Sequence, residues 1–263
     1  MEYDYIIICV QADLEIFNQL LNMGIKKDKI LIASILFSDR NLFYSQNNED
    51  AIVIMLLHVL KLTYSDITYL ELGTNHPVNL NNTYGLYRLG ACGVLVEPNK
   101  DLHNFIEAIR PRDILVKKAV SLDGNPAEFY NLKSNELSTL SYDKLDKDFC
   151  DTIESFKLKE TYLVETITIN ELFELTREVP DVVSIDIEGY DYAVLNQINF
   201  RKHRPKIFII EMGAWGAKEQ DGKRIKELLL KNGYLLFHNN GTNGIFIDEK
   251  YRESIRQYIV NKY

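Results

Sequence analysis

Residues 68–77, Thr-Tyr-Leu-Glu-Leu-Gly-Thr-Asn-His-Pro, restrict the folds that this chain can adopt. The first five have the composition of a short buried strand, and Glu71 is its one acidic residue. Gly73 then breaks the strand, and the next helical pattern begins near Leu80. Doubly wound α/β folds bind ligands at the carboxyl edge of the sheet, where a glycine lets a ligand approach the backbone closely. The stretch therefore predicts an α/β fold with a ligand site beside Gly73.

Acidic side chains recur where three later apolar strands end. These residues are Glu97, Asp186 with Glu188, and Glu211. Carboxylates are rarely buried without partners, and parallel strands end at one edge of their sheet. The pattern therefore predicts a group of acidic residues around a ligand that carries hydroxyls or positive charge.

Composition excludes several classes of protein. The 263 residues include 46% hydrophobic side chains, and 38 acidic against 30 basic side chains leave a net charge of −8, which argues against nucleic-acid binding. Three widely spaced cysteines fit a reducing compartment rather than a disulfide framework or a zinc site. No apolar run reaches the roughly 20 residues of a membrane helix, and the acidic, strand-like N-terminus is unlike a signal peptide. We expect a cytoplasmic protein without a membrane partner.

The N-terminal part of the chain predicts a separate small unit. Residues 4–34 contain an apolar run, a helical pattern that ends at Gly24, and a second apolar run. This order is typical of two parallel strands joined by a helix. We therefore divide the chain into a βαβ extension, residues 1–43, and a main domain, residues 44–263. The extension either widens the sheet or contacts a second copy in a homodimer, and a role in substrate binding is the alternative.

The main domain alternates strands with helices and closes with a hairpin. The predicted strands are residues 68–72, 93–96, 113–120, 182–187 and 206–211, with a hairpin of 234–237 and 244–247. The predicted helices are residues 51–62, 83–88, 101–110, 170–176, 192–197, 221–231 and 249–262. Residues 124–165 are mixed and are not assigned in detail. This alternation predicts a mostly parallel sheet with one antiparallel edge.

Two of the acidic residues suggest contacts with a nucleotide-like ligand. Glu97 follows the second strand of the main unit, where nucleotide-binding folds place the carboxylate that accepts two ribose hydroxyls. Its alternative role is to cap the following helix, and Asn99 is a rival for that role. Glu71 and Gly73 either flank the aminoacyl part of a ligand or fix the turn between strand and helix.

The sequence Asp-Ile-Glu-Gly at 186–189 gives the strongest chemical signal. If it continues a strand, Asp186 and Glu188 point to the same side, and such a pair raises one pKa so that the other carboxylate can act as a general base. The pair could equally hold a divalent metal or form an inert network. His76 and His238, on loops at the same edge, either touch the substrate or are merely solvated. Trp215 either stacks on a sugar or base, or packs its own loop.

Several short motifs occur in a fixed order along the chain. They are residues 45–50, 71–77, 82–84, 93–99, 119–121, 137–139, 184–189 with Asp191, Val194 and Leu195, and 204–211. In this order the chain resembles the FkbM-type family of S-adenosylmethionine-dependent O-methyltransferases. The resemblance covers roughly residues 44–248 and leaves the first 40 residues outside it.

The resemblance implies a seven-stranded, Rossmann-like class I methyltransferase sheet that binds S-adenosylmethionine. Glu97 would bind the ribose of this cofactor, residues 119–121 would lie near the adenine, and Asp186 and Glu188 would lie beside the transferred methyl. The glycine-rich first loop of the family is reduced here to one glycine. The implied cofactor-binding residues are Glu71, Gly73, Thr74, Asn75, Thr83, Glu97, Pro98, Ala119, Val120, Ser121 and Asp186.

The expected activity is methyl transfer to a hydroxyl of a sugar or nucleotide-linked sugar, such as a polysaccharide or glycan precursor. Asp186 is the first candidate for the base, followed by Glu188, His76 and His238, and no resident metal is assigned. The candidate acceptor-binding residues are Ser138, Thr139, Glu211, Trp215 and His238. One alternative is a nicotinamide-dependent oxidoreductase or epimerase of nucleotide sugars, but the chain lacks Gly-x-Gly-x-x-Gly, and its one Tyr-x-x-x-Lys lies in the last helix. A non-catalytic nucleotide-binding domain is the other alternative.

Overall fold

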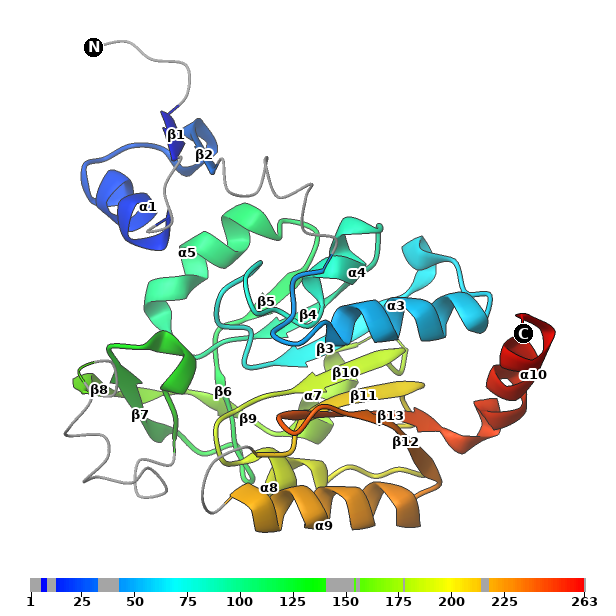
Figure 1. Ribbon diagram of the computed structural model, residues 1–263. Coiled ribbons are helices and arrows are strands. Elements are labelled where there is room, and N and C mark those ends of the chain that lie inside the picture. The colour runs from blue at the N-terminus through cyan, green and yellow to red at the C-terminus, as the bar shows by residue number, and fades with distance from the viewer. Residues whose placement is uncertain are drawn as a thin grey trace.

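A seven-stranded sheet forms the centre of the protein (Figure 1). The computed structural model describes residues 6–8, 13–32, 43–140, 154, 157–176, 178–213 and 218–262. The strand order is β12-β13-β11-β10-β3-β4-β5. Their bounds are β3 (Thr68–Leu72), β4 (Cys92–Val96), β5 (Ile114–Val116), β10 (Val182–Ile185), β11 (Ile207–Glu211), β12 (Tyr234–Asn239) and β13 (Asn243–Asp248).

The sheet is parallel except for its C-terminal hairpin. β3 pairs in parallel with β4 and β10, and β10 with β11, whereas β13 is antiparallel to both β11 and β12. Leu72 is in register with Val96 on one side and with Ile185 on the other, so three strands end at one level. The predicted mostly parallel sheet with an antiparallel C-terminal hairpin is confirmed.

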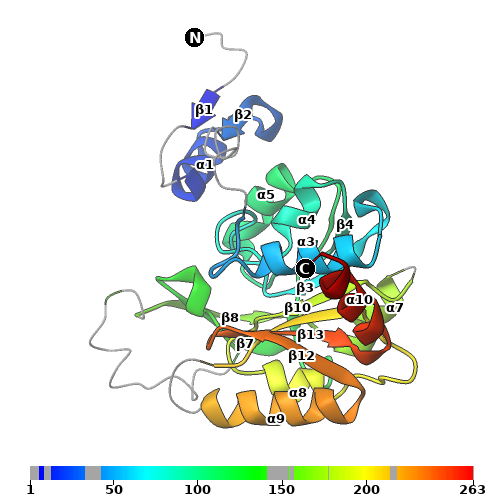
Figure 2. The ribbon, with the colours of Figure 1, turned by 45° about the vertical axis from the view of Figure 1, so that its right-hand side comes forward.

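Helices cover both faces of this sheet (Figures 1 and 2). One face packs against α3 (Glu49–Val59), α4 (Tyr84–Arg88), α5 (Lys100–Ile109) and α10 (Arg252–Lys262). The other packs against α7 (Ile169–Leu175), α8 (Asp191–Leu195) and α9 (Lys218–Lys231). Consecutive strand residues point to opposite faces, so Tyr69 joins the first core and Leu70 the second. Because both faces are covered, the central strands are apolar along almost their whole length.

The predicted strand 113–120 is divided in the structure, which corrects that assignment. β5 belongs to the main sheet, whereas β6 (Ala119–Val120) pairs in parallel with β9 (Thr166–Ile167) in a small sheet of its own. The division falls at Lys117 and Lys118, which are adjacent and both partly exposed. Adjacent strand residues face opposite sides, so a strand that continued through these two lysines would place a charged side chain on each face of the sheet.

The region that the sequence left unassigned contains a second hairpin. β7 (Ala127–Leu132) and β8 (Leu158–Val164) are antiparallel and lie beside the main sheet. Short 3₁₀ helices complete the described structure: η1 (Lys27–Lys29), η3 (Tyr64–Asp66), η4 (Asn135–Leu137) and η7 (Glu249–Tyr251). None of the helices in the described ranges has both the length and the apolarity that a bilayer span requires.

The N-terminal unit is the predicted βαβ arrangement. β1 (Ile6–Ile8) and β2 (Ile30–Ile32) are parallel, and α1 (Asp13–Asn22) connects them in the chain. Their two-stranded sheet does not join the seven-stranded one, so the idea that the extension widens the main sheet is wrong. The unit instead packs on α5, where the rings of Phe17 and Phe105 meet edge to face at 5.4 Å. The proposed boundary after residue 43 stays a prediction, since residues 33–42 lie outside the described ranges.

Candidate active site

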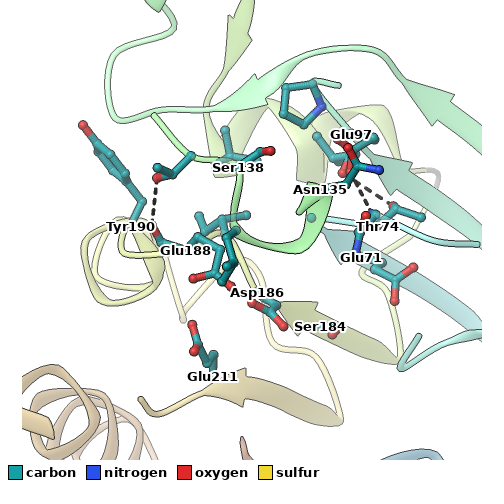
Figure 3. Close-up of a pocket in the computed structure, with 18 of the residues that line it drawn as sticks. Glu71, Thr74, Glu97, Asn135, Ser138, Ser184, Asp186, Glu188, Tyr190 and Glu211 are labelled. Atoms are coloured by element: carbon teal, nitrogen blue, oxygen red, sulfur yellow. Dashed lines mark hydrogen bonds between the residues drawn. The ribbon is translucent and has the colours of Figure 1, made fainter. Parts of the chain in front are cut away.

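A cavity of about 290 Å³ lies at the carboxyl ends of β3, β4, β10 and β11 (Figure 3). β4 and β10 lie on opposite sides of β3, so the chain order along the sheet reverses here, as at the ligand sites of doubly wound folds. Most of the residues predicted for the site contribute to its wall. They are Glu71, Gly73, Thr74, Asn75, Glu97, Pro98, Ala119, Val120, Ser138, Thr139, Asp186, Glu188 and Glu211.

The turn after β3 brings backbone to the cavity wall. Gly73 has φ +80°, and a Cβ at this position would overlap the carbonyl oxygen of Asp186 on the neighbouring strand. The amides of Gly73 and Thr74 both donate to the carbonyl of Val96, at 3.0 and 3.2 Å. The turn is therefore wedged between the ends of β4 and β10, where only glycine fits.

Glu97 is buried at the end of β4, with 5% of its surface exposed. Its Oε1 accepts from the amide of Asn99 at 2.7 Å, and its Oε2 accepts from the amide of Asn75 at 2.8 Å. Burial nevertheless raises the pKa of Glu97 to about 7. The side chain of Asn99 caps α5 by accepting from the amide of Asp101 at 3.1 Å. Asn99, and not Glu97, therefore caps α5. Each carboxylate oxygen of Glu97 keeps a lone pair that can accept a hydrogen bond from a ligand.

Glu71 is the second buried carboxylate of the wall, with 3% exposure. Its Oε2 accepts from Asn81 Nδ2 at 3.0 Å and from Thr83 Oγ1 at 3.1 Å. Burial raises the pKa of Glu71 to about 7. Thr83, predicted to bind cofactor, is not among the lining residues, because its hydroxyl turns to Glu71 instead.

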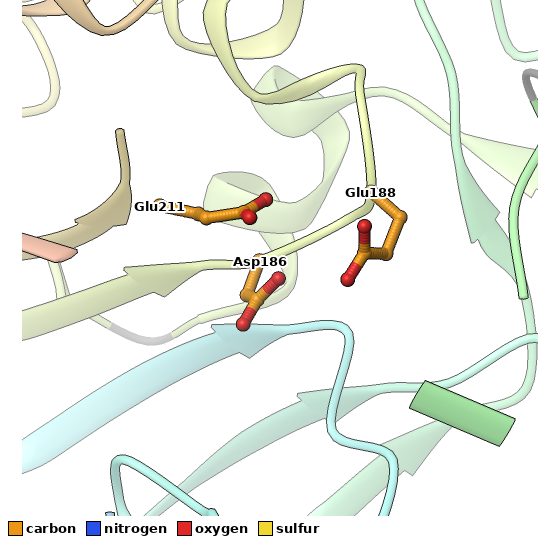
Figure 4. A group of neighbouring side chains, drawn as sticks. All are labelled: Asp186, Glu188 and Glu211. Atoms are coloured by element: carbon orange, nitrogen blue, oxygen red, sulfur yellow. The ribbon is translucent and has the colours of Figure 1, made fainter. Parts of the chain in front are cut away.

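Three half-buried carboxylates form a cluster at the other end of the cavity (Figure 4). Asp186, Glu188 and Glu211 each place an oxygen within 4.8 Å of the others. β10 ends at Ile185 and Glu188 has φ +50°, so the sequence argument that residues 186 and 188 share one side of a strand is wrong. A turn and the neighbouring strand β11 bring the carboxylates together instead. Such a group could hold a divalent ion or bind hydroxyls and cations.

The side chain of Asp191, at the start of α8, holds this turn. Asp191 accepts from the amide of Ile187 and from the amide of Gly189, both at 3.0 Å. Two local hydrogen bonds to one carboxylate fix the loop that carries Glu188. This anchoring lets Glu188 adopt a left-handed conformation that a non-glycine residue rarely takes.

A strap, defined here as residues 133–140, crosses the cavity from one group of carboxylates to the other. Near Glu97 the strap is held by Asn99 Nδ2, which donates to Asn135 Oδ1 at 3.3 Å. At its other end Thr139 Oγ1 donates to the carbonyl of Glu188 at 2.9 Å. Figure 3 shows Glu71 and Glu97 at one end, Glu188 and Glu211 at the other, and Asp186 between them.

The two predicted histidines lie away from the cavity lining. His76 Nδ1 accepts from the amides of Val78 and Asn79 at 3.1 and 2.9 Å, and its ring meets Phe105 edge to face. The ring of His76 accepts hydrogen bonds within its own turn. Its position therefore gives no support to a role for His76 as the base. His238 belongs to β12 and not to a loop.

Two further residues predicted for the site are not among the described residues that line the cavity. Ser121 lies behind the cavity wall, with its hydroxyl 2.6 Å from that of Thr166 and accepting from the amide of Gly124. Trp215 lies outside the described residues.

The sequence reasoning missed several polar lining residues. They include Gln46, Asn81, Asn82, Asn135, Ser184, Tyr190 and Thr242. Asn81 and Asn82 were not assigned to the site, yet Asn82 Nδ2 reaches across to Ser184 Oγ at 3.1 Å. Three consecutive polar residues shortly after the turn at Gly73 were the available signal. The strap residue Asn135 carried no such signal, because its position depends on contacts with distant parts of the chain, whereas Ser138 and Thr139 were expected through the family resemblance.

This fold and this cavity define a class of protein: an α/β protein with a Rossmann-like sheet whose ligand site lies at the point where strand order reverses. The Methyltransferase FkbM domain matches residues 71–236, more than half of the chain. The chain therefore belongs to the FkbM family of S-adenosylmethionine-dependent methyltransferases, and S-adenosylmethionine is its cofactor.

Solved structures of other methyltransferases resemble the chain only distantly. An O-methyltransferase from Bacillus cereus in complex with SAH has 13% identity and a TM-score of 0.40, with 91% of this chain and 90% of that chain covered. A putative caffeoyl-CoA O-methyltransferase from Staphylococcus aureus has 10% identity and a TM-score of 0.43, with 89% and 97% covered. A comparison with curated proteins found no match.

Proposed function

We propose that the protein transfers a methyl group from S-adenosylmethionine to a hydroxyl of a sugar or nucleotide-linked sugar. The observation that carries this proposal is the position of Glu97 and Asp186 in the wall of one cavity, on the same rim of the sheet. The bound cofactor would supply an electrophilic methyl on its sulfonium. Gly73 brings the backbone of its turn to the cavity wall, and two buried carboxylates beside it suit the hydroxyls and the ammonium of that cofactor.

The donor would occupy the end of the cavity that contains Glu71 and Glu97. Glu97 would accept hydrogen bonds from the ribose hydroxyls through the lone pairs that its two backbone donors leave. The turn at Gly73, Thr74 and Asn75, with Glu71, would hold the aminoacyl part. Pro98, Ala119 and Val120, which also line the cavity, would flank the adenine.

The acceptor would occupy the end that contains the carboxylate cluster. A sugar hydroxyl is a poor nucleophile at neutral pH, so a base must take its proton during attack. Asp186 lies between the two ends of the cavity and would take this role. Glu188, Glu211 and the strap residues Ser138 and Thr139 would orient the acceptor through its other hydroxyls, and such alignment supplies much of the rate.

The test is Asp186→Asn, assayed with S-adenosylmethionine and a panel of sugars and nucleotide sugars. Loss of a general base should lower turnover by about 10²-fold or more, while the affinity for S-adenosylhomocysteine stays within a few-fold. The matched control is Asp66→Asn, an isosteric change at an exposed residue, which should leave turnover unchanged. Near-normal turnover of Asp186→Asn would remove this residue from the mechanism.

A metal-assisted reaction is the second candidate, favoured by the proximity of the oxygens of Asp186, Glu188 and Glu211. An ion held there would acidify the acceptor hydroxyl directly. The two mechanisms differ after treatment with a chelator. A carboxylate base predicts that EDTA leaves turnover unchanged, whereas a metal-assisted reaction predicts a loss that Mg²⁺ or Mn²⁺ restores.

A further inference from the structure

Arg110 follows α5 and is buried, with 1% of its surface exposed. Its guanidinium is hydrogen-bonded on every nitrogen. Nε donates to Asp113 at 2.7 Å, one terminal nitrogen donates to Tyr69 at 2.9 Å, and the other donates to the carbonyl of Pro77 at 3.2 Å. A buried charge destabilises a protein unless it is paired and hydrogen-bonded, and here both conditions are met.

Two further bonds from Arg110 connect it to the cavity wall. It donates to Asn81 Oδ1 at 3.2 Å and to Thr83 Oγ1 at 2.9 Å. Asn81 and Thr83 are the two side chains that donate to Glu71 Oε2. Because Arg110 takes the oxygen end of the Asn81 amide, the NH₂ end must point to Glu71 and to the carbonyls of Thr74 and His76. Arg110 thus fixes both donors to Glu71 without touching the cavity.

Both hydrogen bonds that the described residues make to Glu71 go to one oxygen, Oε2. Glu71 lines the cavity, so Oε1 is the oxygen that it can present to a ligand. For this purpose the carboxyl must be ionised. Burial opposes ionisation and raises the pKa of Glu71, whereas the charge of Arg110 lowers that pKa.

Other charged and titratable groups also face Glu71. Asp113, the ion-pair partner of Arg110, raises its pKa, and the charges of Glu71 and Glu97 oppose each other. Asp186 lies on the neighbouring strand end, and Tyr69, Tyr84 and His76 surround the same network. Among the groups around it, Arg110 has the largest effect in favour of the ionised form of Glu71, because its positive charge lowers the pKa of that carboxyl.

We propose that Arg110 is a positioning residue of the donor site, which holds Glu71 in place and keeps it ionised so that Oε1 binds the ammonium group of the methyl donor. This inference rests on the proposed function. It names the group of the cofactor that the buried carboxylate recognises, and it assigns a role in cofactor binding to a residue outside the cavity.

The test measures the affinity for S-adenosylhomocysteine, which carries the same ammonium group, by calorimetry between about pH 5.5 and 8.5, where that amine stays largely protonated. The wild-type affinity should fall as pH decreases through about 7, the pKa of Glu71, by up to about tenfold per pH unit. Glu71→Gln should remove the part of this dependence that comes from the ammonium contact and leave only the part that the titration of Glu97 contributes. Glu97→Gln should leave the part due to Glu71 in place, so the two single variants separate carboxylates of similar pKa.

Variants of the ion pair should shift this pH dependence in opposite directions. Arg110→Met should move the midpoint up by about one pH unit, so that affinity is lost near neutral pH and recovers at high pH. Asp113→Asn should move the midpoint down, because Arg110 then acts on Glu71 without an opposing carboxylate. Arg110→Lys, which keeps the charge, should shift the midpoint less than Arg110→Met. Arg204→Met, which breaks the similar ion pair with Asp248 away from the cavity, should not shift it.

A merely structural role for Arg110 would lower affinity equally at every pH, and this result would overturn the proposal. So would a pH dependence that Glu71→Gln leaves unchanged, or shifts of the same sign in Arg110→Lys and Asp113→Asn. If Arg110→Met does not fold, these two milder variants carry the test. Failure of the proposed function is distinguishable, because the wild type would then transfer no methyl group to any sugar tested while the pH dependence of S-adenosylhomocysteine binding persists.

Discussion

Leu80 lines the cavity in a conformation that leucine rarely adopts, with φ +57°. More than half of its surface, 56%, is exposed. A left-handed conformation costs a non-glycine residue roughly 1–2 kcal/mol. Asn75 and Glu188 line the same cavity with φ +48° and +50°. Backbone strain concentrates at functional sites when a side chain is needed at a fixed position, so we infer that Leu80 offers an apolar contact to a ligand.

Leu80→Gly should therefore raise stability while it weakens function. Glycine relieves the left-handed strain, and we expect a gain of about 1 kcal/mol in the free energy of unfolding. Loss of the side chain should raise the KM for the cofactor or the acceptor by several-fold. Leu89 is a matched control, since it is exposed with φ −81°, and Leu89→Gly should lower stability and leave KM unchanged. A stabilised Leu80→Gly with normal KM values would show that Leu80 has no contact with a ligand.

At the level of elements, the turn at Gly73 fits between the ends of β4 and β10 only because residue 73 is a glycine. Gly73→Ala introduces both a strained φ and an overlap with the backbone of Asp186. Gly241 has a similar φ of +93°, but a Cβ there meets nothing within 4 Å. Gly241→Ala should thus cost only about 1 kcal/mol of stability, whereas Gly73→Ala should cost several and abolish binding of S-adenosylhomocysteine. Thermal unfolding measures the change in stability, and calorimetry measures the binding of S-adenosylhomocysteine. Equal losses of stability in the two variants would contradict the close contact between Gly73 and the backbone of Asp186.

The elements that the sequence predicted are those with local signals. β3 was found from its apolar run and the glycine that follows it, and α7 from its helical spacing; both match within a residue or two. The turn at Glu188 was mistaken for strand because the residue with positive φ is a glutamate and not a glycine. The side chain of Asp191, which accepts a hydrogen bond from the turn, stabilises it instead. The course of the strap was not predicted, although Ser138 and Thr139 were candidate acceptor-binding residues, since Thr139 is fixed by the carbonyl of Glu188, 49 positions away. Contacts across such distances leave no periodic pattern in the sequence.

At the scale of the whole molecule, the arrangement of strands makes the site predictable even where single residues are not. Parallel strands in register end at one level, so acidic residues at successive strand ends must meet at one rim. The sequence therefore located Glu71, Glu97 and Asp186 correctly at the cavity. The same arrangement buries two carboxylates in a low-dielectric wall, and this has a consequence for global stability.

Glu71 and Glu97 should make the ligand-free protein lose stability as pH rises. Burial raises both pKa values from 4.5 to about 7. A carboxyl whose pKa is higher in the folded state stabilises the fold fully below its unfolded pKa, and this contribution is lost as pH rises through the folded value. A shift of this size corresponds to roughly 3 kcal/mol for one group, and the two contributions are not additive because the residues repel each other.

The measurement is urea unfolding of the wild type and of the double variant Glu71→Gln with Glu97→Gln, at several pH values between 4.5 and 8. Relative to the double variant, the wild type should lose several kcal/mol of stability across this interval, and the loss should be spread between about pH 4.5 and 7 and end above pH 7. Exposed Glu128→Gln, as the control, should follow the wild-type curve. Saturating S-adenosylhomocysteine should flatten the difference, because hydroxyls and an ammonium group favour the ionised carboxylates. Parallel curves for the wild type and the double variant would mean that neither carboxyl titrates in this range, and the pH dependence of cofactor binding would then need another source.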